Sequence, residues 1–509
     1  MNKGICIPVA DRTVAGFIEK LARASSSADL IELRFDSLSR SEFNCEDIDS
    51  AKAVLREIFE LHSTTPWITT FRPREHGGER EISAVERTNF WGSGFETEIA
   101  DLEEDLVEDS WYWLWGERIC SFHDFAGVPE NLESLFAQLA ETKAETIKIA
   151  VLVGDAADAV PVWKLFADAE KFGSRIIPIA MGEAGKWTRI LGLAHGAPIT
   201  YAAFDGESST APGQITARDL RRVYRVNELD RDTGVFGVVA GDTSYSLSPY
   251  MHNAAFAHAG INSVFVPFQV ADLAAFLRRM VRSGTREIDI NIRGLSVTNP
   301  HKQTIIEHLD DIDETARSIG AVNTVKIDGR KLIGYNTDAP GFITPLRDAF
   351  GDLRGSRVTV AGAGGAARAC IYALRKDGAD VTVLARDSVR AAQLADEFGV
   401  RIQELITDDR RPETIQADIL VNTTPLGTRG SGENESIATA DELCGVKLVY
   451  DLVYNPTETR LLREARLAGA KTMGGLEMLI AQGARQFEIW TGREAPFPVM
   501  RSAVSQRLK

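Results

Sequence analysis

The 509-residue chain is predicted to be an α/β protein in two parts, a closed parallel barrel followed by a two-lobed α/β region. Its length exceeds one ordinary domain, since domains usually contain roughly 100–250 residues. Short β-like runs alternate with helical stretches through the first ~220 residues, which is the size of a compact barrel. Further on, a glycine-rich turn joins a strand to a helix at Gly362–Gly365.

Eight short apolar runs in the first part predict a (β/α)8 barrel. They are Gly4–Pro8, Leu30–Arg34, Trp67–Phe71, Phe95–Leu102, Ile119–His123, Thr146–Leu152, Ile176–Met181 and Ile199–Phe204. Several polar residues fall at the ends of these runs, among them Glu32, Arg34, Arg72 and His123. Catalytic groups of such barrels gather at the C-terminal ends of the strands.

Composition narrows the classes of function. The formal net charge of −16 argues against a nucleic-acid partner. The five cysteines are scattered without a Cys-x-x-Cys pair, so neither a metal site nor a disulfide framework is expected. The N-terminus has no apolar signal region, and no segment reaches the roughly 20 apolar residues of a membrane span. We therefore expect no membrane association and a cytoplasmic location.

A charged stretch separates the two parts. Residues 221–234 carry many charges and, after Leu229, few large apolar side chains. A new α/β pattern begins at Val235–Gly241. We therefore expect the barrel to occupy residues 1–222 and the junction near Glu228–Thr233 to be polar, exposed and cleavable into two active halves.

Lys148 and His123 suggest imine chemistry in the barrel. Lys148 lies inside the apolar run Thr146–Leu152, where burying an ammonium is costly. A neutral amine there is a nucleophile toward a carbonyl, and His123 from the preceding run could move protons. The alternatives are a lysine at the rim of the sheet and a structural histidine.

Arginines in the same part suit a substrate carboxylate, because the guanidinium offers two parallel donors. Arg189 is the best candidate by its place after Met181-Gly182. Arg34 and Glu32 could instead form an ion pair that closes the barrel mouth.

Five motifs occur in order and carry a resemblance. They are Glu32-Leu33-Arg34-Phe35-Asp36, Thr70-Phe71-Arg72, Phe122-His123-Asp124-Phe125, Ile147-Lys148-Ile149-Ala150 and Ala211-Pro212-Gly213-Gln214. Together they resemble type I 3-dehydroquinate dehydratase across residues 1–220. The resemblance implies that Lys148 forms an imine and that His123 is the general acid and base. It also implies substrate contacts from Glu32, Arg34, Arg72, Arg189, Thr210 and Gln214.

The chain departs from this family at two positions. The family commonly has a glutamate, thought to orient the catalytic histidine, before the glycine pair that corresponds to Gly77 and Gly78. Here His76 holds that position and Glu75 comes one residue earlier, so either could replace the glutamate. Thr210 stands where the family often has serine, which keeps a hydroxyl.

The glycine turn predicts a Rossmann domain. Glycines let the backbone approach a pyrophosphate at a helix N-terminus, and the run Arg357–Ala369 has this pattern. The next strand, Asp380–Ala385, is followed by Arg386, which suits the 2′-phosphate of NADP. A solvated surface arginine is the alternative, and the adjacent Asp387 keeps use of NAD open.

Polar motifs around this domain suit a small hydroxylated acid. They are Ser246-Leu247-Ser248-Pro249, whose two serines would share one side of an extended chain, and then Val297-Thr298-Asn299-Pro300-His301-Lys302, Gly320-Ala321-Val322-Asn323-Thr324 and Tyr335-Asn336-Thr337-Asp338. Three more follow: Asn422-Thr423-Thr424-Pro425, Asp451-Leu452-Val453-Tyr454 and Gly474-Gly475-Leu476-Glu477-Met478-Leu479-Ile480-Ala481-Gln482. Together they resemble shikimate dehydrogenase over residues 235–509.

That resemblance implies Lys302 and Asp338 as the catalytic pair. It implies substrate contacts from Ser246, Ser248, Thr298, Asn323, Tyr454 and Gln482. It implies NADP contacts from Gly362, Ala363, Gly364, Gly365, Ala366, Arg386, Thr423 and Gly475.

The two resemblances name consecutive steps, from 3-dehydroquinate to 3-dehydroshikimate and then to shikimate. We expect a substrate-binding α/β domain at 233–339, a Rossmann domain at 340–476 and C-terminal helices at 477–509 that return to the substrate domain. Two alternatives are a catabolic quinate/shikimate dehydrogenase that uses NAD and a ligand-sensing regulator built from inactive enzymes. The presence of Lys148, His123, Lys302 and Asp338 argues against the regulator. The oligomeric state does not follow from the sequence.

Overall fold

A computed structural model describes residues 3–60, 65–95, 97–107, 116–142, 144–205, 210–404, 414–430 and 432–508. The chain forms two compact units. Unit 1 consists of Met1–Val235, Asp242–Ser244 and Asn262–Asn291. Unit 2 consists of Phe236–Gly241, Tyr245–Ile261 and Ile292–Lys509. The described residues contain no helix that is long and apolar enough to cross a membrane.

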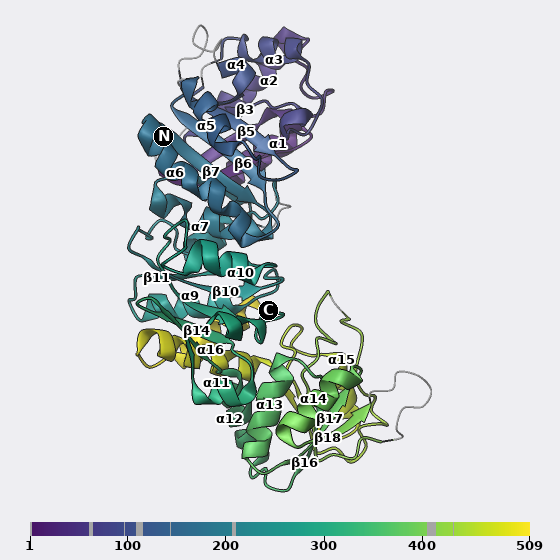
Figure 1. The fold of residues 1–509 in the computed structure, drawn as a ribbon. Coiled ribbons are helices and arrows are strands. Elements are labelled where there is room, and N and C mark those ends of the chain that lie inside the picture. Colours follow the sequence, from purple (N-terminus) through teal and green to yellow (C-terminus); the bar gives the residue numbers. More distant parts are fainter. Residues whose placement is uncertain are drawn as a thin grey trace. The chain divides into compact units, whose positions relative to one another are not determined.

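A parallel sheet organises unit 1, in the strand order β7-β6-β5-β4-β3-β2-β1-β8-β9 (Figure 1). Its strands are β1 (Gly4–Val9), β2 (Leu30–Arg34), β3 (Trp67–Thr70), β4 (Ile99–Glu103), β5 (Glu117–Asp124), β6 (Thr146–Leu152), β7 (Arg175–Met181), β8 (Ile199–Ala203) and β9 (Ile215–Thr216). This is the order of an eight-stranded parallel barrel, to which β9 adds a short strand beside β8. The α/β barrel prediction is confirmed.

All eight predicted runs are strands, and the largest difference in bounds is at β4. It begins at Ile99 rather than Phe95. The ring of Phe95 packs instead against the aromatic rings of Phe59 and Phe90, at centroid distances of 5.5 and 5.1 Å. The apolar run Phe95–Leu102 therefore begins with a core residue, Phe95, that precedes the strand.

Helices follow most of the strands. They are α1 (Val14–Ala24), η1 (Phe35–Ser37), α2 (Ile48–Glu60), η2 (Arg74–His76), α3 (Ala84–Trp91), α4 (Glu104–Val107), α5 (Leu132–Glu141), η4 (Ala156–Ala159), α6 (Val160–Phe172), η5 (Glu183–Gly185), α7 (Lys186–His195) and α8 (Ala217–Arg222). Local sequence sets several ends. Ser83 and Glu86 form a capping box that starts α3, and Gly173 ends α6 in the left-handed conformation.

The interior of the barrel holds alternate residues of its strands. A buried cluster there includes Cys6, Leu30, Ile68, Ile99 and Ile119. Because strand side chains alternate between faces, residues two positions further along point the same way. Polar residues occupy those later positions, namely Glu32, Thr70, Asp101 and Ser121. The strand period therefore places an apolar layer at one end of the barrel and polar groups at the other.

Unit 1 also contains residues 262–291, with β11 (Ser263–Gln269), α10 (Leu273–Phe276) and the π-helix η6 (Leu277–Val281). In the predicted junction at 228–233, Glu228, Asp230, Arg231 and Asp232 are exposed as expected, but Leu229 is buried. Thr233 is buried and donates its hydroxyl hydrogen to Asn262 Oδ1 at 2.8 Å. Asn291 donates to the carbonyl of Thr233 at 3.1 Å. Hydrogen bonds thus tie the junction to the segment that follows.

Five strands of a second sheet belong mainly to unit 2, in the order β10-β12-β14-β15-β13. They are β10 (Gly234–Ala240), β12 (Ile292–Val297), β13 (Asp311–Ile312), β14 (Thr324–Asp328) and β15 (Lys331–Tyr335). The accompanying helices are α9 (Ser248–His258), η7 (Thr304–His308), α11 (Glu314–Ile319), α12 (Asp338–Phe350), α16 (Leu476–Thr491) and α17 (Phe497–Arg507). The two C-terminal helices pack on α9.

A parallel sheet in the order β18-β17-β16-β19-β20-β21 forms the other lobe of unit 2. Its strands are β16 (Arg357–Ala361), β17 (Asp380–Ala385), β18 (Arg401–Glu404), β19 (Ile419–Asn422), β20 (Leu448–Asp451) and β21 (Lys471–Gly474), and its helices are α13 (Gly365–Lys376), α14 (Ser388–Phe398) and α15 (Arg460–Leu467). Val358 and Val360 of β16 and Val381 and Val383 of β17 are buried in the core of this lobe. The Rossmann-like fold is confirmed.

Candidate active sites

Lys148 lies on β6 inside the barrel and is almost fully buried. Its Nζ donates to Asp101 Oδ2 at 2.8 Å and to the Tyr201 hydroxyl at 3.1 Å, and lies 3.6 Å from Glu32 Oε1. The alternative of a lysine at the rim of the sheet is therefore wrong, and the predicted burial of Lys148 within a strand is confirmed. Asp101 supplies the negative charge that a buried ammonium requires.

Arg72 connects this carboxylate to the rest of the barrel mouth. Its Nη2 donates to Asp101 Oδ1 at 2.6 Å and to Ser121 Oγ at 2.9 Å, and its Nε donates to Glu103 at 3.3 Å. Burial alone would raise the pKa of Asp101, but the charges of Arg72 and Lys148 hold it well below its usual range. Burial raises the pKa of Glu103 to about 7. In this structure Arg72 binds protein carboxylates, and its predicted substrate contact stays a prediction.

His123, at the end of β5, lies beside the same guanidinium. Its Nε2 is 3.4 Å from Arg72 Nη1, and its buried Nδ1 has no hydrogen-bond partner among the described residues. Burial, together with the charges of Arg72 and Lys148, lowers the pKa of His123 well below 6.5. A guanidinium only donates, so Nε2 is the acceptor here. The imidazole is therefore neutral near pH 7, as a general base must be.

The loop at Arg74–His76 does not supply a partner for His123 in this structure. Glu75 is exposed and His76 is half-buried, and neither makes a side-chain hydrogen bond or ion pair within the described residues. Gly77, next in the chain, lies against His123, since a Cβ there would come 3.9 Å from the Cβ of His123. A replacement of the family glutamate by Glu75 or His76 stays a prediction.

Two other predicted arginines differ in their surroundings. Arg34 makes a two-pronged contact with Asp36, at 3.0 and 2.7 Å, so the alternative of an ion pair with Glu32 is wrong. Glu32 accepts from the Thr70 hydroxyl at 2.9 Å instead. Arg189, on α7, is buried with one hydrogen bond, from Nη2 to the carbonyl of Pro212 at 3.3 Å, and its Nε has none.

Arg189 is therefore suited to an external anion. No carboxylate of the described residues pairs with it, and burial lowers its pKa to about 10. The Pro212 carbonyl belongs to the loop that carries Thr210 and Gln214, whose side chains contact each other at 3.2 Å. These two residues also line a cavity of about 420 Å³ with residues that include Arg12, just after β1, and Lys20 of α1.

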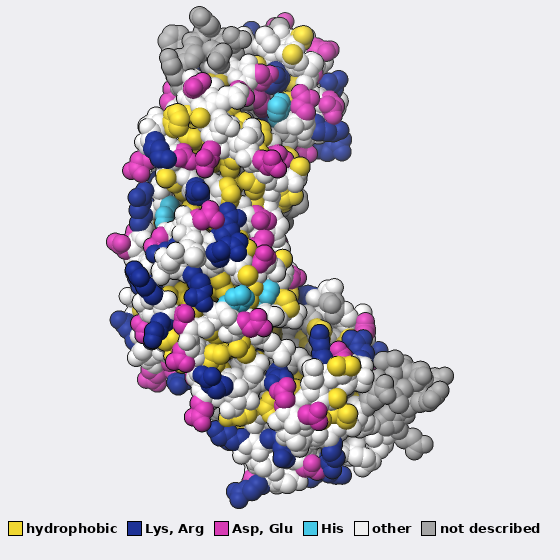
Figure 2. Space-filling view, in the orientation of Figure 1, with side chains coloured by type: hydrophobic (Ala, Val, Ile, Leu, Met, Phe, Trp, Pro, Cys, Tyr) yellow, Lys and Arg dark blue, Asp and Glu magenta, His cyan; other side chains and the backbone are white. Residues whose placement is uncertain are grey.

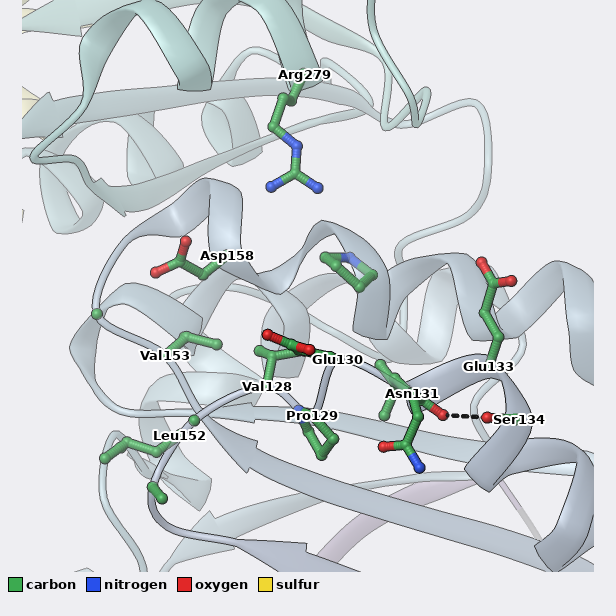
Figure 3. Close-up of a pocket in the computed structure, with 15 residues that line it drawn as sticks. Val128, Pro129, Glu130, Asn131, Glu133, Ser134, Leu152, Val153, Asp158 and Arg279 are labelled. Atoms are coloured by element: carbon green, nitrogen blue, oxygen red, sulfur yellow. Dashed lines mark hydrogen bonds between the residues drawn. The ribbon is translucent and has the colours of Figure 1, made fainter.

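A second cavity of unit 1, of about 1100 Å³, lies elsewhere (Figure 3). It is lined by residues 126–134 after β5, residues 152–154 after β6, Asp158, Pro161 and Arg279. None of the predicted site residues lines it. The larger of these two cavities is therefore not the predicted active site of the barrel.

In unit 2, Lys302 and Asp338 form the predicted pair, with Nζ 2.6 Å from Oδ2. Asp338 is the first residue of α12, and its other oxygen accepts from Asn323 Nδ2 at 2.8 Å. Asn323 is fixed in turn by Thr337, whose backbone N–H donates to Oδ1 at 2.8 Å. Gln482 lies 3.5 Å from the same amide. The carboxylate is thus oriented from both sides.

Four predicted substrate-binding residues do not belong to the hydrogen-bond network around Lys302 and Asp338. No hydrogen bond joins Ser246, Ser248, Thr298 or Tyr454 to Lys302 or Asp338 within the described residues. The expected extended conformation at the two serines is wrong, because Leu247 is helical and Ser248 opens α9. Pro249 favours this helix start, since its fixed φ suits the first turn. Burial raises the pKa of the Tyr454 hydroxyl.

The glycine turn fits a nucleotide phosphate. Gly362 has a φ of +113°, and a Cβ there would lie 2.4 Å from Thr423 Oγ1, so only glycine fits. Gly365 opens α13 directly beside Lys302, whose Cδ would be 3.1 Å from an added Cβ. The helix N-terminus therefore faces the catalytic pair without a side chain between them, and a backbone cradle of this kind binds anions. Ala363, Gly364 and Ala366 complete the turn, while Gly475 precedes α16.

Arg386 and Asp387, which follow β17, differ in their contacts. Arg386 is exposed and makes no hydrogen bond or ion pair in the described part of the chain. Asp387 caps α14 by accepting the backbone N–H of Arg390 at 3.0 Å. The structural role of Asp387 removes the argument that it reads a ribose hydroxyl. A free guanidinium at this position fits the 2′-phosphate of NADP.

Sequence reasoning missed three members of the first site: Asp101, Glu103 and Tyr201. Asp101 lies within the predicted run Phe95–Leu102, and a carboxylate inside a buried strand was its signal. Its partners, Arg72 just after β3 and Lys148 on β6, lie 29 and 47 residues away in the chain, which no local pattern reveals.

The folds and the two lysine–carboxylate pairs define a bifunctional α/β enzyme, a barrel lyase joined to a nucleotide-dependent dehydrogenase. The family model described as type I 3-dehydroquinase matches residues 5–231. The shikimate dehydrogenase substrate binding domain matches residues 238–325, shikimate/quinate 5-dehydrogenase 346–433, and the shikimate 5′-dehydrogenase C-terminal domain 475–504.

Relatives agree with these matches. A bifunctional 3-dehydroquinate dehydratase/shikimate dehydrogenase of Arabidopsis thaliana, named chloroplastic, is 34% identical over 97% of this chain and 82% of its own. The NADP+-dependent shikimate dehydrogenase of Methanopyrus kandleri is 43% identical over 55% of this chain and 98% of its own. A crystal structure of a shikimate dehydrogenase with NADP+ matches at a TM-score of 0.50 and 40% identity, over 55% of this chain and 98% of that one. The chain belongs to the family of bifunctional 3-dehydroquinate dehydratase/shikimate dehydrogenases.

Proposed function

We propose that the two sites carry out consecutive reactions at the residues described above. The chain is a bifunctional enzyme, a 3-dehydroquinate dehydratase in its first half and an NADP-dependent shikimate dehydrogenase in its second. The observation that carries the assignment of the first site is the buried Lys148 amine beside Asp101 and a neutral His123.

At the first site, Lys148 loses a proton and attacks the ketone of 3-dehydroquinate, and water leaves as the imine forms. The cationic imine withdraws electrons and acidifies the adjacent C–H bond. His123 takes that proton and later returns it to the departing hydroxyl, which leaves as water. Hydrolysis of the imine then releases 3-dehydroshikimate and restores the lysine. Asp101 balances the positive charge on the nitrogen throughout.

Arg189 holds the substrate carboxylate in this proposal. Among the residues that the structure describes, it is the buried guanidinium without a carboxylate partner, whereas Arg34 and Arg72 are paired with Asp36 and Asp101. A substrate carboxylate would give this guanidinium the charge-assisted hydrogen bonds that no protein carboxylate supplies among the described residues. Glu32, Thr210 and Gln214 would contact the substrate hydroxyls.

At the second site, Lys302 donates a proton to the carbonyl oxygen of 3-dehydroshikimate, and Asp338 holds a substrate hydroxyl while it orients the lysine. Bound NADPH supplies the hydride. The backbone cradle at Gly362–Ala366 and the free Arg386 are the residues that would hold it, with Thr423 and Gly475 at its edges. Ser246, Ser248, Thr298, Asn323, Tyr454 and Gln482 would shape the pocket for shikimate.

One assay tests the whole proposal. The intact chain with 3-dehydroquinate and NADPH should form shikimate, with one NADPH consumed per shikimate. Formation of 3-dehydroshikimate without oxidation of NADPH would leave only the first assignment standing. Oxidation of NADPH with 3-dehydroshikimate but not with 3-dehydroquinate would leave only the second.

The domain bounds and the location are also proposals. We assign 1–222, 233–339, 340–476 and 477–509 to the dehydratase, the substrate domain, the NADP domain and the returning helices. The family matches and the packing of α16 and α17 on α9 support this division. A cytoplasmic location is favoured by five free cysteines. Fluorescent tagging of the intact chain would test it.

A further inference from the structure

We propose that residues 262–291, which follow the junction, position the carboxylate-binding arginine of the dehydratase. We name them the bracing segment. They come after the barrel in sequence, yet they belong to the same compact unit. The inference rests on the proposed role of Arg189 and adds a positioning role for Asp155 and Phe268, which lie outside the active site.

Asp155 links the loop after β6 to the bracing segment. It is largely buried, and its Oδ1 accepts the N–H of Ala157 at 2.8 Å, which caps η4. Its Oδ2 accepts the N–H of Ala271 at 2.6 Å and that of Asp272 at 3.0 Å. One carboxylate therefore satisfies three backbone donors from two stretches of chain. Without it, the start of α10 loses its connection to η4.

A second contact holds η4 from the same side. Arg279 of η6 donates from Nη1 to the carbonyl of Ala157 at 2.8 Å, and Glu287 fixes the guanidinium at 2.6 Å. Figure 3 shows Arg279 extending from its helix toward the stretch that carries Asp158. The bracing segment thus contacts η4 through a carboxylate and a guanidinium.

An aromatic contact carries this support to α7. Trp187 is fully buried, and its indole N–H donates to the carbonyl of Ala156 in η4 at 3.3 Å. Its ring centroid lies 6.4 Å from that of Phe268, which is also fully buried on β11. Trp187 therefore fills the space between η4 and the bracing segment.

Arg189 follows Trp187 by two residues on the same helix. Its side chain has a single hydrogen bond, to Pro212, so its own contacts cannot fix the guanidinium. No side chain caps the N-terminus of α7 either. The packing of Trp187 therefore sets the direction of this first turn together with the Thr188 hydroxyl, which donates to the Gly185 carbonyl at 2.8 Å and accepts from the Ala180 N–H at 3.3 Å. A displacement of about 1 Å can cost roughly 100-fold in rate when a group must meet a substrate.

The test uses the full-length chain with Asp155→Ala, Arg189→Ala and the double variant. Asp155→Ala should raise KM for 3-dehydroquinate at least about fivefold. Borohydride should still trap the substrate on Lys148, and the dehydrogenase constants should stay within about twofold, because its candidate residues lie in unit 2. Phe268→Leu should give a smaller rise. Asp168→Ala, which removes an aspartate from an exposed pair with Lys171, is the matched control.

The double variant distinguishes positioning from general damage. If Asp155 acts through Arg189, then Asp155→Ala should raise KM no further in the Arg189→Ala background. An additional rise equal to that in the wild type would overturn the inference, and so would an unchanged KM in Asp155→Ala. If Asp155→Ala is insoluble, Asp155→Asn, which keeps one acceptor oxygen, takes its place in the same cycle. An Arg189→Ala variant with normal KM would instead reject the proposed role of Arg189.

Discussion

The two sites share a lysine and an aspartate but use them in different settings. Lys148 and Asp101 are 2.8 Å apart with side chains 5% and 0% exposed, while Lys302 and Asp338 are 2.6 Å apart with side chains 15% and 6% exposed. The first pair is surrounded by Arg72, Glu32 and Tyr201, which confine the amine inside the barrel. The second lies at a helix start beside the glycine turn. Burial and neighbours, rather than the residue pair, set the chemistry.

Substitution of each lysine by alanine should have the largest effect, because each variant should lose one reaction and keep the other. Lys148→Ala should abolish dehydration and leave the dehydrogenase constants within about twofold, since the pairs belong to different units. Lys302→Ala should lower the reductive kcat by about 10²–10⁴-fold, the usual contribution of a positioned acid. Steady-state assays with each substrate measure both effects.

Borohydride reduction provides the control for the first lysine. In the presence of 3-dehydroquinate it should leave a reduced imine on Lys148, which adds the mass of the bound substrate or product minus one water plus two hydrogens, in the wild type and in Lys302→Ala. An adduct on a different lysine, or normal dehydration without any adduct, would contradict the imine mechanism.

Replacing the aspartates should reveal the difference in burial. Asp101→Asn leaves Arg72 and Lys148 without a full counter-charge, and breaking such a buried pair costs about 3–5 kcal/mol. Asp338→Asn should cost less than half of that, because the Lys302 side chain can reach solvent. Urea unfolding followed by circular dichroism measures the two losses in the free energy of unfolding. Equal losses would show that the settings do not differ energetically.

Cofactor choice tests the second setting alone. Arg386→Ala should weaken NADPH binding by about 1.5–3 kcal/mol, or ~10–150-fold, and NADH binding much less. Arg390→Ala is the matched control, since Arg390 lies in the first turn of α14, close to Arg386 in the chain, and already pairs with Asp387 at 3.3 Å. Titrations of both variants with each nucleotide give the ratio. Equal affinities of the wild type for NADPH and NADH would reject the assignment.

The sequence predicted those features that depend on neighbouring residues in the chain. Strand period places Lys148 inside the barrel, and the glycine turn with Arg386 follows from phosphate chemistry. It could not predict that Arg34 pairs with Asp36 rather than with Glu32, because both are equally close in sequence. It could not predict that Thr233 and Asn262 bind each other, or that Phe268 packs on Trp187 from 81 residues away. Such contacts depend on the tertiary fold.

The pH profile of dehydration should reflect the lowered pKa of His123. A base is active when unprotonated, so activity is lost as the pH falls through its pKa, which lies well below 6.5. Between pH 6.5 and 8 the kcat/KM for 3-dehydroquinate should therefore change less than about twofold from this group. A rate-versus-pH curve with Lys148 trapping as a parallel readout checks it. An acid limb centred at the ordinary histidine value would show that burial and Arg72 do not act on His123 as described.

The smallest effect is expected at the loop that departs from the family. Glu75 is exposed and has no side-chain partner in the described part of the chain, so Glu75→Ala should keep the dehydratase rate within about twofold. His76 is half-buried and precedes Gly77, which lies against His123, so His76→Ala should slow dehydration about threefold to tenfold and shift its acid limb. Imine trapping should persist in both variants, because Lys148 keeps Asp101 and Tyr201. Wild-type rates in both would mean that neither residue replaces the family glutamate, and that Arg72 alone orients His123. A larger loss of dehydratase rate in Glu75→Ala than in His76→Ala would mean that the loop moves toward His123 when substrate binds. The Glu75 carboxylate would then orient His123 at the first site, as Asp338 orients Lys302 at the second.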